Sequence, residues 1–290
     1  MSHCPAVGGR EYRPAVDGLG GKCRQPVPPS LGRMSLLAGK HLLVTGVLTE
    51  TSLASAVVRT AREQGAEVLL TSPLCRGWTV TSRVAPRLGV DADVLELDVT
   101  LPEDLAGLAA AVRDAGWDRV DGVLHAIAYL PESDRSGGFA ATPWDVVAQT
   151  LQTGAWSLAA VVEALRPLLP RGASVVALDL DAGRAWRGQD WLGVAQAGLE
   201  STSRYLARDL GPDGVRINVV ACGPQKTLLS RAIDGRDELV AAWDARAPLG
   251  WDATDRTAVA KAAVMLLSDF FPATTGQVLH VDGGAHAIGA

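Results

Sequence analysis

The sequence predicts a single doubly wound α/β domain, with a seven-stranded parallel sheet and helices on both faces. Short apolar segments alternate along the chain with segments whose apolar residues recur at helical spacing. Alternation of this kind is typical of parallel strands joined by crossover helices. At 290 residues and 48% hydrophobic content, the chain is long enough for one large core and too short for two typical domains.

Seven segments read as strands. The first, residues 41–45, is an apolar run that ends at Gly46, and the others are residues 67–71, 94–97, 122–127, 174–178, 216–220 and 278–281. Helices are expected at residues 52–64, 103–115, 143–168 and 191–210. Gly65 and Gly116 directly follow two of these helices, as C-cap glycines do.

The first 33 residues differ from the rest. They are rich in proline and glycine, and their apolar residues do not recur at a spacing that would form a buried face. We therefore expect residues 1–33 to be a flexible basic tail or a mis-assigned start, with Met34 as the alternative first residue, and residues 34–290 to be the domain. Because the segment is basic, a targeting role is the other interpretation.

Charge and cysteine content exclude several classes of protein. The formal net charge is −5 and the isoelectric point about 5.6, which argues against binding nucleic acid or an anionic membrane. The four cysteines form no CxxC pair, and His280 and His286 lack metal-ligand spacing, so we expect no metal. The absence of a long apolar run and the cysteine usage lead us to expect a cytoplasmic protein.

The turn after the first strand is the first candidate for cofactor binding. A strand that leads through a loop into a helix N-terminus offers free N–H groups and a positive helix end to a pyrophosphate. Of the usual G-x-G-x-x-G fingerprint only Gly46 is present, so an ordinary strand–turn–helix is the alternative. Asp98, at the end of the third strand, is either an acceptor for an adenine amino group or a turn residue.

These residues carry a resemblance to a known family. The segment GVLTETSLA (46–54) resembles the divergent phosphate-binding turn of the enoyl-acyl-carrier-protein reductases, a branch of the short-chain dehydrogenase/reductase superfamily. The similarity continues in order through LELDVT (95–100), DGVLHAIAYLP (121–131), GVRINVVACGPQKTL (214–228) and ATTGQVLHVDGGAH (273–286). It spans residues 35–290 and is greatest to the NADH-dependent mycobacterial long-chain branch. It implies a Rossmann-type fold and a homotetramer.

The resemblance also implies a cofactor, NAD(H), and where it is held. The pyrophosphate is assigned to Gly46, Ser52 and Leu53, the adenine to Asp98 and Val99, the ribose and nicotinamide to Ile127 and Ala128, and the carboxamide end to Pro224 and Thr227. No acidic residue ends the second strand, and Arg76 nearby is either a partner for the 2′-phosphate of NADPH or a surface residue. By resemblance we favour NADH.

The two catalytic positions of the family are different here. Gln189 stands where the family has a Tyr that bonds the thioester carbonyl, and Gln196 where it has a Lys that binds the nicotinamide ribose. The amide of Gln196 can still bond ribose hydroxyls, and that of Gln189 can donate to a carbonyl oxygen but releases no proton at neutral pH. The alternative is that both are solvated helix-face residues of a non-catalytic paralogue.

Three more residues are candidates for substrate contact. Tyr129, in the loop after the fourth strand, is either a relocated phenol or an aromatic lid residue. Leu180 matches the pocket Phe of the family, and Trp186 either shapes a pocket for a planar substrate or fills core. Asp179 and Asp181 flank the expected substrate site. Either of them is a candidate carboxylate base, whereas the resemblance implies a mainly structural role for both.

Taken with these differences, the resemblance implies an oxidoreductase of fatty acid biosynthesis that transfers hydride from NADH to a trans-2-enoyl thioester of acyl-carrier protein or coenzyme A. Because of the two glutamines, we expect either a slow reaction or an atypical substrate. Two alternatives stay open: a non-redox enzyme, such as an isomerase or cyclase, on the same scaffold, and a non-catalytic paralogue that binds NADH or acyl groups. The expected partners are the acyl thioester and copies of the chain, and neither nucleic acid nor a membrane is expected as a partner.

Overall fold

A computed structural model describes residues 35–73, 76–130, 138–233 and 235–289. The predicted tail, residues 1–33, lies outside the described residues. Within the described part of the chain, no helix is both long and apolar enough to cross a membrane.

The seven predicted strands are all present and form one parallel sheet in the order β3-β2-β1-β4-β5-β6-β7. Their bounds are β1 His41–Val44, β2 Glu67–Ser72, β3 Leu95–Glu96, β4 Gly122–His125, β5 Ser174–Leu180, β6 Arg216–Cys222 and β7 Val278–Val281. The order grows outward in both directions from β1 and β4, which is the doubly wound topology that the sequence predicts.

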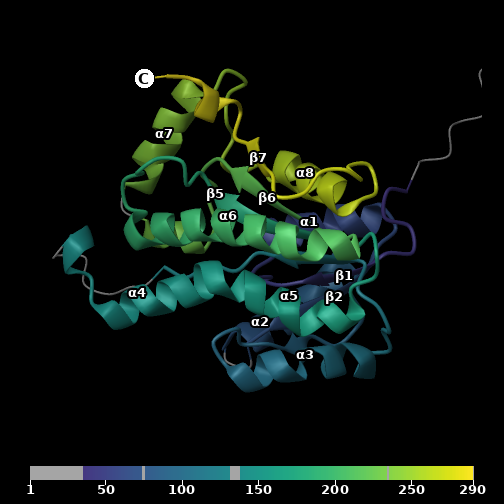
Figure 1. Ribbon diagram of the computed structural model, residues 1–290. Coiled ribbons are helices and arrows are strands. Elements are labelled where there is room, and N and C mark those ends of the chain that lie inside the picture. The colour runs from purple at the N-terminus through teal and green to yellow at the C-terminus, as the bar shows by residue number, and fades with distance from the viewer. Residues whose placement is uncertain (1–34, 74–75, 131–137, 234, 290) are drawn as a thin grey trace, which may run out of the picture. The chain divides into compact units, whose positions relative to one another are not determined.

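The helices cover both faces of this sheet. They are α1 Leu53–Glu63, α2 Arg76–Val84, α3 Pro102–Asp114, α4 Trp144–Leu151, α5 Ser157–Leu165, α6 Asp190–Leu210, α7 Arg236–Arg246 and α8 Thr257–Leu267. In β1, Leu42 and Val44 pack with α1, α2 and α8, whereas Leu43 between them packs with α3, α5 and α6. Figure 1 shows α6 crossing the near face of the sheet beside α5, with α1 and α8 behind. Side chains on alternate strand positions therefore fill two separate cores.

The structure adds detail that the sequence pattern did not predict. The helices expected at residues 143–168 are α4 and α5, and a π-helical turn, Gln152–Trp156, joins them. In that turn, a β carbon on Gly154 would lie 3.0 Å from the β carbon of Ala195 in α6. The turn and α6 thus approach closely. Helices α2, α7 and α8 were not predicted.

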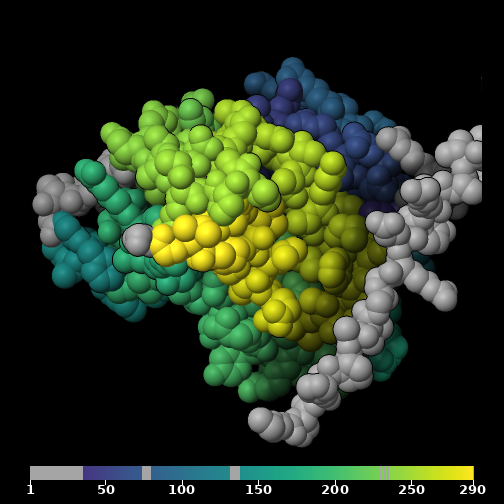
Figure 2. Space-filling model, turned by 90° about the horizontal axis from the view of Figure 1, so that it is seen from above, coloured from purple at the N-terminus to yellow at the C-terminus, as the bar shows by residue number. Residues whose placement is uncertain are grey.

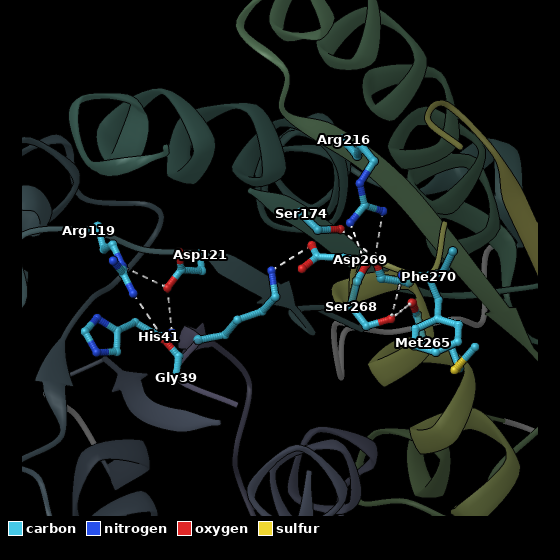
Figure 3. A network of polar contacts seen from close by, with 12 residues as sticks. Gly39, His41, Arg119, Asp121, Ser174, Arg216, Met265, Ser268, Asp269 and Phe270 are labelled. Carbon is cyan, nitrogen blue, oxygen red and sulfur yellow. Dashed lines mark hydrogen bonds and ion pairs between the residues drawn. The ribbon is translucent and has the colours of Figure 1, made fainter. Parts of the chain in front are cut away.

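A buried arginine joins the N-terminal end of β6 to the C-terminal end of α8. Arg216, the first residue of β6, donates from Nη1 to the carbonyl oxygen of Leu266 at 2.9 Å and from Nη2 to that of Ser268 at 2.8 Å (Figure 3). The hydroxyl of Ser174 also donates to the Leu266 carbonyl, at 2.7 Å. These donors satisfy carbonyl groups that the end of a helix leaves free.

At the other end of the sheet, α7 packs against the C-terminal segment. Trp243 of α7 is 3% exposed, forms a small cluster with Ala247 and Ala285, and donates from Nε1 to the carbonyl oxygen of Asp282 at 3.0 Å. Figure 2 shows the yellow C-terminal residues lying against the yellow-green residues of the preceding helices. This cluster closes the side of the site described next.

Candidate active site

A cavity of about 270 Å³ opens at the carboxyl ends of the strands. Strand order reverses between β1 and β4, and in open α/β sheets ligands bind in the crevice beside such a reversal. Ten of the predicted site residues line this single cavity: Gly46, Ser52, Leu53, Ile127, Ala128, Leu180, Gln189, Gln196, Pro224 and Thr227. The sequence thus predicted residues that lie far apart in the chain, at or after the ends of β1, β4, β5 and β6 and on α6, and the fold brings them together.

Gly46 sits at the closest approach of the loops that follow β1 and β4. Its φ is +77°, and a β carbon there would lie 1.9 Å from the carbonyl oxygen of Ala126. Thr45 joins the same two loops, because its hydroxyl accepts from the Ala126 N–H at 3.0 Å and donates to the Leu124 carbonyl at 3.1 Å. Only glycine fits at position 46 without moving this backbone.

The N-terminus of α1 faces the cavity from the same loop. Ser52 caps the helix, with its hydroxyl oxygen accepting from the Ser55 N–H at 3.1 Å. No acidic side chain stands in the first turn of α1. The positive end of the helix is therefore free of a neutralising carboxylate, as an anion site requires.

Gln189 and Gln196 enter the cavity from α6. Gln189 is the N-cap residue of the helix and Gln196 lies two turns further on, so both project from one face. They are 6% and 2% exposed, and the side-chain oxygen of each has no hydrogen-bond partner among the described residues. The alternative of solvated helix-face residues is therefore wrong: burial without a partner leaves these amides available to a ligand.

The backbone around Gln189 is unusual. Asp190, the first residue of α6, has a φ of +42°, the one positive value among the described residues other than glycine. Gly188, on the other side of Gln189, has a φ of +76°. Strained backbone of this kind persists where the surrounding structure holds a side chain in place, and here it directs the Gln189 amide into the cavity.

The loop after β6 forms another wall of the cavity. Trp251 donates from Nε1 to the Pro224 carbonyl at 2.8 Å, and Thr227 and Ser230 bond each other through N–H and hydroxyl groups. Gln225, which sequence reasoning missed, is 3% exposed, and its side-chain oxygen has no partner among the described residues. Its signal in the sequence was a polar residue between Pro224 and Lys226 at a strand end.

Two buried titratable groups lie side by side at the bottom of the cavity. The Cys222 thiol of β6 donates to the backbone carbonyl of Asp179 in β5 at 3.2 Å, and burial raises its pKa to about 12. Burial also raises the pKa of the Asp179 carboxyl well above its ordinary value, and the negative charge of Glu200 on α6 adds to this shift. Both groups therefore favour their protonated forms.

Four predicted site residues are not part of the cavity lining. Asp98 accepts from the N–H of Thr100 at 2.9 Å and from its hydroxyl at 2.6 Å, which is the turn role weighed above, and Val99 is 5% exposed within the core. Tyr129 is half-buried in the loop after β4. Trp186 packs against Trp243, with ring centroids 4.7 Å apart, and so fills core beside the site.

Comparison with known proteins shows to which family the chain belongs. The profile of the family described as Enoyl-(Acyl carrier protein) reductase matches residues 46–286, which is most of the chain. The chain belongs to the enoyl-acyl-carrier-protein reductase family. It is 41% identical over 263 residues to the NADH enoyl-acyl-carrier-protein reductase of Mycolicibacterium smegmatis, a match covering 86% of this chain and 97% of that one.

Two further relatives carry the same description. The enzyme of Mycobacterium avium is 38% identical over 262 residues, covering 86% of this chain and 97% of its own. That of Aquifex aeolicus is 34% identical over 258 residues, covering 88% of this chain and 94% of its own. Among the described residues, the lining of this cavity holds neither a tyrosine nor a lysine.

Proposed function

We propose that this protein is an NADH-dependent reductase of trans-2-enoyl thioesters, carried by acyl-carrier protein or coenzyme A, in fatty acid biosynthesis. The observation that supports it most is that three features converge on one cavity: the Gly46 loop, the N-terminus of α1, and the two buried glutamines of α6, whose side-chain oxygens have no partner among the described residues. A repurposed non-redox enzyme and a non-catalytic binding protein become outcomes of the test below.

The residues present fit a dinucleotide. The loop after β1 lets no side chain intrude at Gly46, and α1 presents its first N–H groups beside Ser52 and Leu53, as a pyrophosphate requires. On the far side of the cavity, the Gln196 amide can accept from one ribose hydroxyl and donate to the other. Ile127 and Ala128 would pack beside the nicotinamide, and Pro224 and Thr227 would hold its carboxamide. Asp98 and Val99 stay proposed contacts of the adenine, beyond the cavity.

When bound, NADH supplies the hydride that reduces the β carbon of the enoyl group. The chain's own task is to bind the thioester carbonyl oxygen while negative charge develops there. Gln189 can donate from its amide nitrogen to that oxygen, and its burial strengthens the bond by excluding water. A neutral amide stabilises an enolate less than a more acidic donor would, so we expect slow turnover. Leu180 is proposed to border the acyl group, and Tyr129 is proposed as an auxiliary donor at the mouth.

Calorimetric titration with NADH and with NADPH, followed by NADH-oxidation rates with short and long trans-2-enoyl thioesters, tests this function. We expect NADH to bind more tightly than NADPH and slow turnover that Gln189→Ala reduces. Tyr129→Phe should reduce it further if the phenol assists. Failure of NADH to bind would exclude the reductase, and binding without turnover on any thioester would favour the non-catalytic or non-redox alternative.

We also propose that the protein is cytoplasmic, on the basis of its cysteine usage. We propose that it is a homotetramer, on the basis of its resemblance to the family. Leu249 is 88% exposed and Leu279 of β7 38% exposed, which provides apolar surface near the C-terminal segment for subunit contact. Light scattering of the purified protein checks the mass of the assembly. A monomer at micromolar concentration would contradict the tetramer without affecting the proposed activity.

A further inference from the structure

Reduction of an enoyl thioester needs a proton as well as a hydride, and the amide of Gln189 cannot supply one. The proton must reach the α carbon from water or from a group of the cavity. Four titratable side chains of described residues line the cavity: Asp179, Asp181, Cys222 and Arg236. Their surroundings decide which of them can hold and release a proton near neutral pH.

Cys222 and Arg236 do not qualify. The thiol of Cys222 is buried with a pKa of about 12, so it does not release its proton near neutrality. The guanidinium of Arg236 stays charged, and it is paired with Asp237 at 3.0 Å. The choice therefore lies between the two aspartates at the end of β5.

Asp179 and Asp181 have opposite hydrogen-bonding environments although they are two residues apart. In Asp181, Oδ1 accepts from the Gly183 N–H at 3.0 Å and Oδ2 from the indole N–H of Trp186 at 3.0 Å. Both carboxyl oxygens of Asp181 are therefore occupied by donors of the protein itself. Asp181 is thus an acceptor that positions Trp186.

Asp179 has one donor and one free oxygen. Its Oδ1 accepts from the Leu180 N–H at 2.7 Å, whereas Oδ2 has no partner among the described residues. The residue is 3% exposed. An ionised Oδ2 in this position would be desolvated and unpaired, whereas a protonated Oδ2 is a neutral donor on a residue of the cavity lining. Two carboxyls with environments this different are the pattern expected of an acid and a fixed carboxylate.

Glu200 supports the protonated form of Asp179 from α6. Its negative charge acts together with that of Asp181 to raise the pKa of Asp179, and burial raises the pKa of Glu200 itself. The Glu200 side chain remains 20% exposed, and Arg204 and His280 oppose its shift. Glu200 is therefore a partly exposed carboxyl whose charge acts on the buried carboxyl of Asp179.

We propose that Asp179 holds a proton on Oδ2 and is the acid that delivers it to the α carbon of the enoyl thioester. This rests on the proposed function. The hydride and its electron pair go to the β carbon, the π electrons of the double bond move onto the α carbon and thioester carbonyl, and the Oδ2–H bond breaks as the α C–H bond forms. Asp179 is left as a carboxylate, and water restores its proton by way of Glu200.

Asp179→Asn is the first test, because the amide keeps the shape and a hydrogen-bond donor but cannot give up a proton. We expect kcat to fall by about 10²-fold, within the range of general acid catalysis, with NADH affinity unchanged. Asp209→Asn, an exposed aspartate at the end of α6, is the matched control and should retain wild-type turnover. Wild-type kcat in Asp179→Asn would overturn the proposal.

Glu200→Gln keeps the proposal falsifiable if Asp179→Asn fails to fold. Turnover should fall as pH rises through the pKa of Asp179, and removal of the Glu200 charge should move that fall to lower pH. The groups facing the pair are Asp181, Cys222 and His280. An unchanged pH profile would contradict the role of Glu200 and, with it, the assignment of the titrating acid.

Carboxyl ¹³C NMR of the ligand-free protein separates this inference from the proposed function. The resonance missing from Asp179→Asn should report a protonated carboxyl at neutral pH in the wild type. An ionised carboxyl would overturn the inference even in an active reductase. A wild type that oxidises no NADH with any enoyl thioester would instead defeat the proposed function, and the delivery step would fall with it.

Discussion

The Nε2 atom of His125 lies 2.8 Å from the hydroxyl oxygen of Ser157, which joins the end of β4 to the first residue of α5. Ser157 donates its own proton to the Thr153 carbonyl at 2.6 Å, inside the π-helical turn. Because that hydroxyl proton is used, His125 is the donor and carries a proton on Nε2, and its ring is neutral near pH 7 because burial lowers its pKa to about 4. The histidine therefore connects the sheet to the turn that packs against α6.

This neutral histidine makes stability depend on pH. Full burial lowers the pKa of His125 to about 4, whereas in the unfolded chain it is the ordinary 6.5. The unfolded chain thus takes up the proton first, and the free energy of unfolding should fall by about 3 kcal/mol as pH falls from 6.5 to 4. Urea denaturation at a series of pH values measures this, and His125→Gln should flatten the curve in that range. An equal slope in both proteins would exclude His125 as its source.

Gly46→Ala should damage both folding and cofactor binding. The new β carbon would meet the Ala126 carbonyl at 1.9 Å and require a left-handed backbone, so the loops after β1 and β4 must separate. We expect a loss of about 2 kcal/mol in stability and a more than tenfold loss in NADH affinity, within the range of strained and overpacked sites. Gly107→Ala in α3, where nothing lies within 4 Å, is the control and should stabilise the helix. Calorimetric NADH affinity equal to wild type in Gly46→Ala would contradict the pyrophosphate site.

Arg216→Met should destabilise the fold without altering the cavity. It removes both guanidinium donors from the buried carbonyls of Leu266 and Ser268 and leaves the latter without its arginine partner. Loss of charged hydrogen bonds at buried carbonyls costs about 3 kcal/mol. Chemical denaturation compares this variant with Arg208→Met, whose arginine is exposed and should change stability little. Equal stability of the two variants would refute the fastening role of Arg216.

The double variant Gln189→Tyr with Gln196→Lys should raise reductase turnover. A phenol is a stronger donor to a developing enolate than an amide, and a lysine adds a positive charge beside the ribose. An increase of about 10²-fold in kcat is expected, comparable to restoring one oxyanion donor. Initial rates of NADH oxidation measure it, with Gln196→Lys alone as the control. No increase in a folded, NADH-binding double variant would mean that more than these two side chains limits the reaction.

Much of the sheet could be predicted because its strands are buried on both faces. A continuous apolar run such as residues 175–178, VVAL, fits a parallel strand in the middle of a sheet and few other elements. Helix α7 was missed because its sequence, RDELVAAWDAR, is largely charged, and its order depends on Trp243 packing against the distant Ala285. Helix α8 is apolar on most positions, so periodicity does not distinguish it from a strand.

Site residues could be predicted from the sequence where a short motif fixes their position. They could not be predicted where their role depends on which atoms the fold buries. The strand–turn–helix pattern indicates the loop at Gly46, and the resemblance to the family adds Ser52. Asp179 was noted as flanking the site, but its free Oδ2 depends on Leu180, Cys222 and α6 packing around it, which no spacing reveals. The sequence allowed Trp186 either to shape a substrate pocket or to fill core. Its contact with Trp243 shows that it packs in the core.

The central claim is that this cavity transfers hydride from NADH to an enoyl thioester. Incubation of the wild-type protein with a trans-2-enoyl thioester and NADH deuterated on the transferred position, followed by mass spectrometry of the acyl product, tests it most directly. The account predicts a saturated acyl thioester with one deuterium on the β carbon and a solvent-derived hydrogen on the α carbon. Unchanged enoyl thioester, or an isomerised product without deuterium, would contradict it.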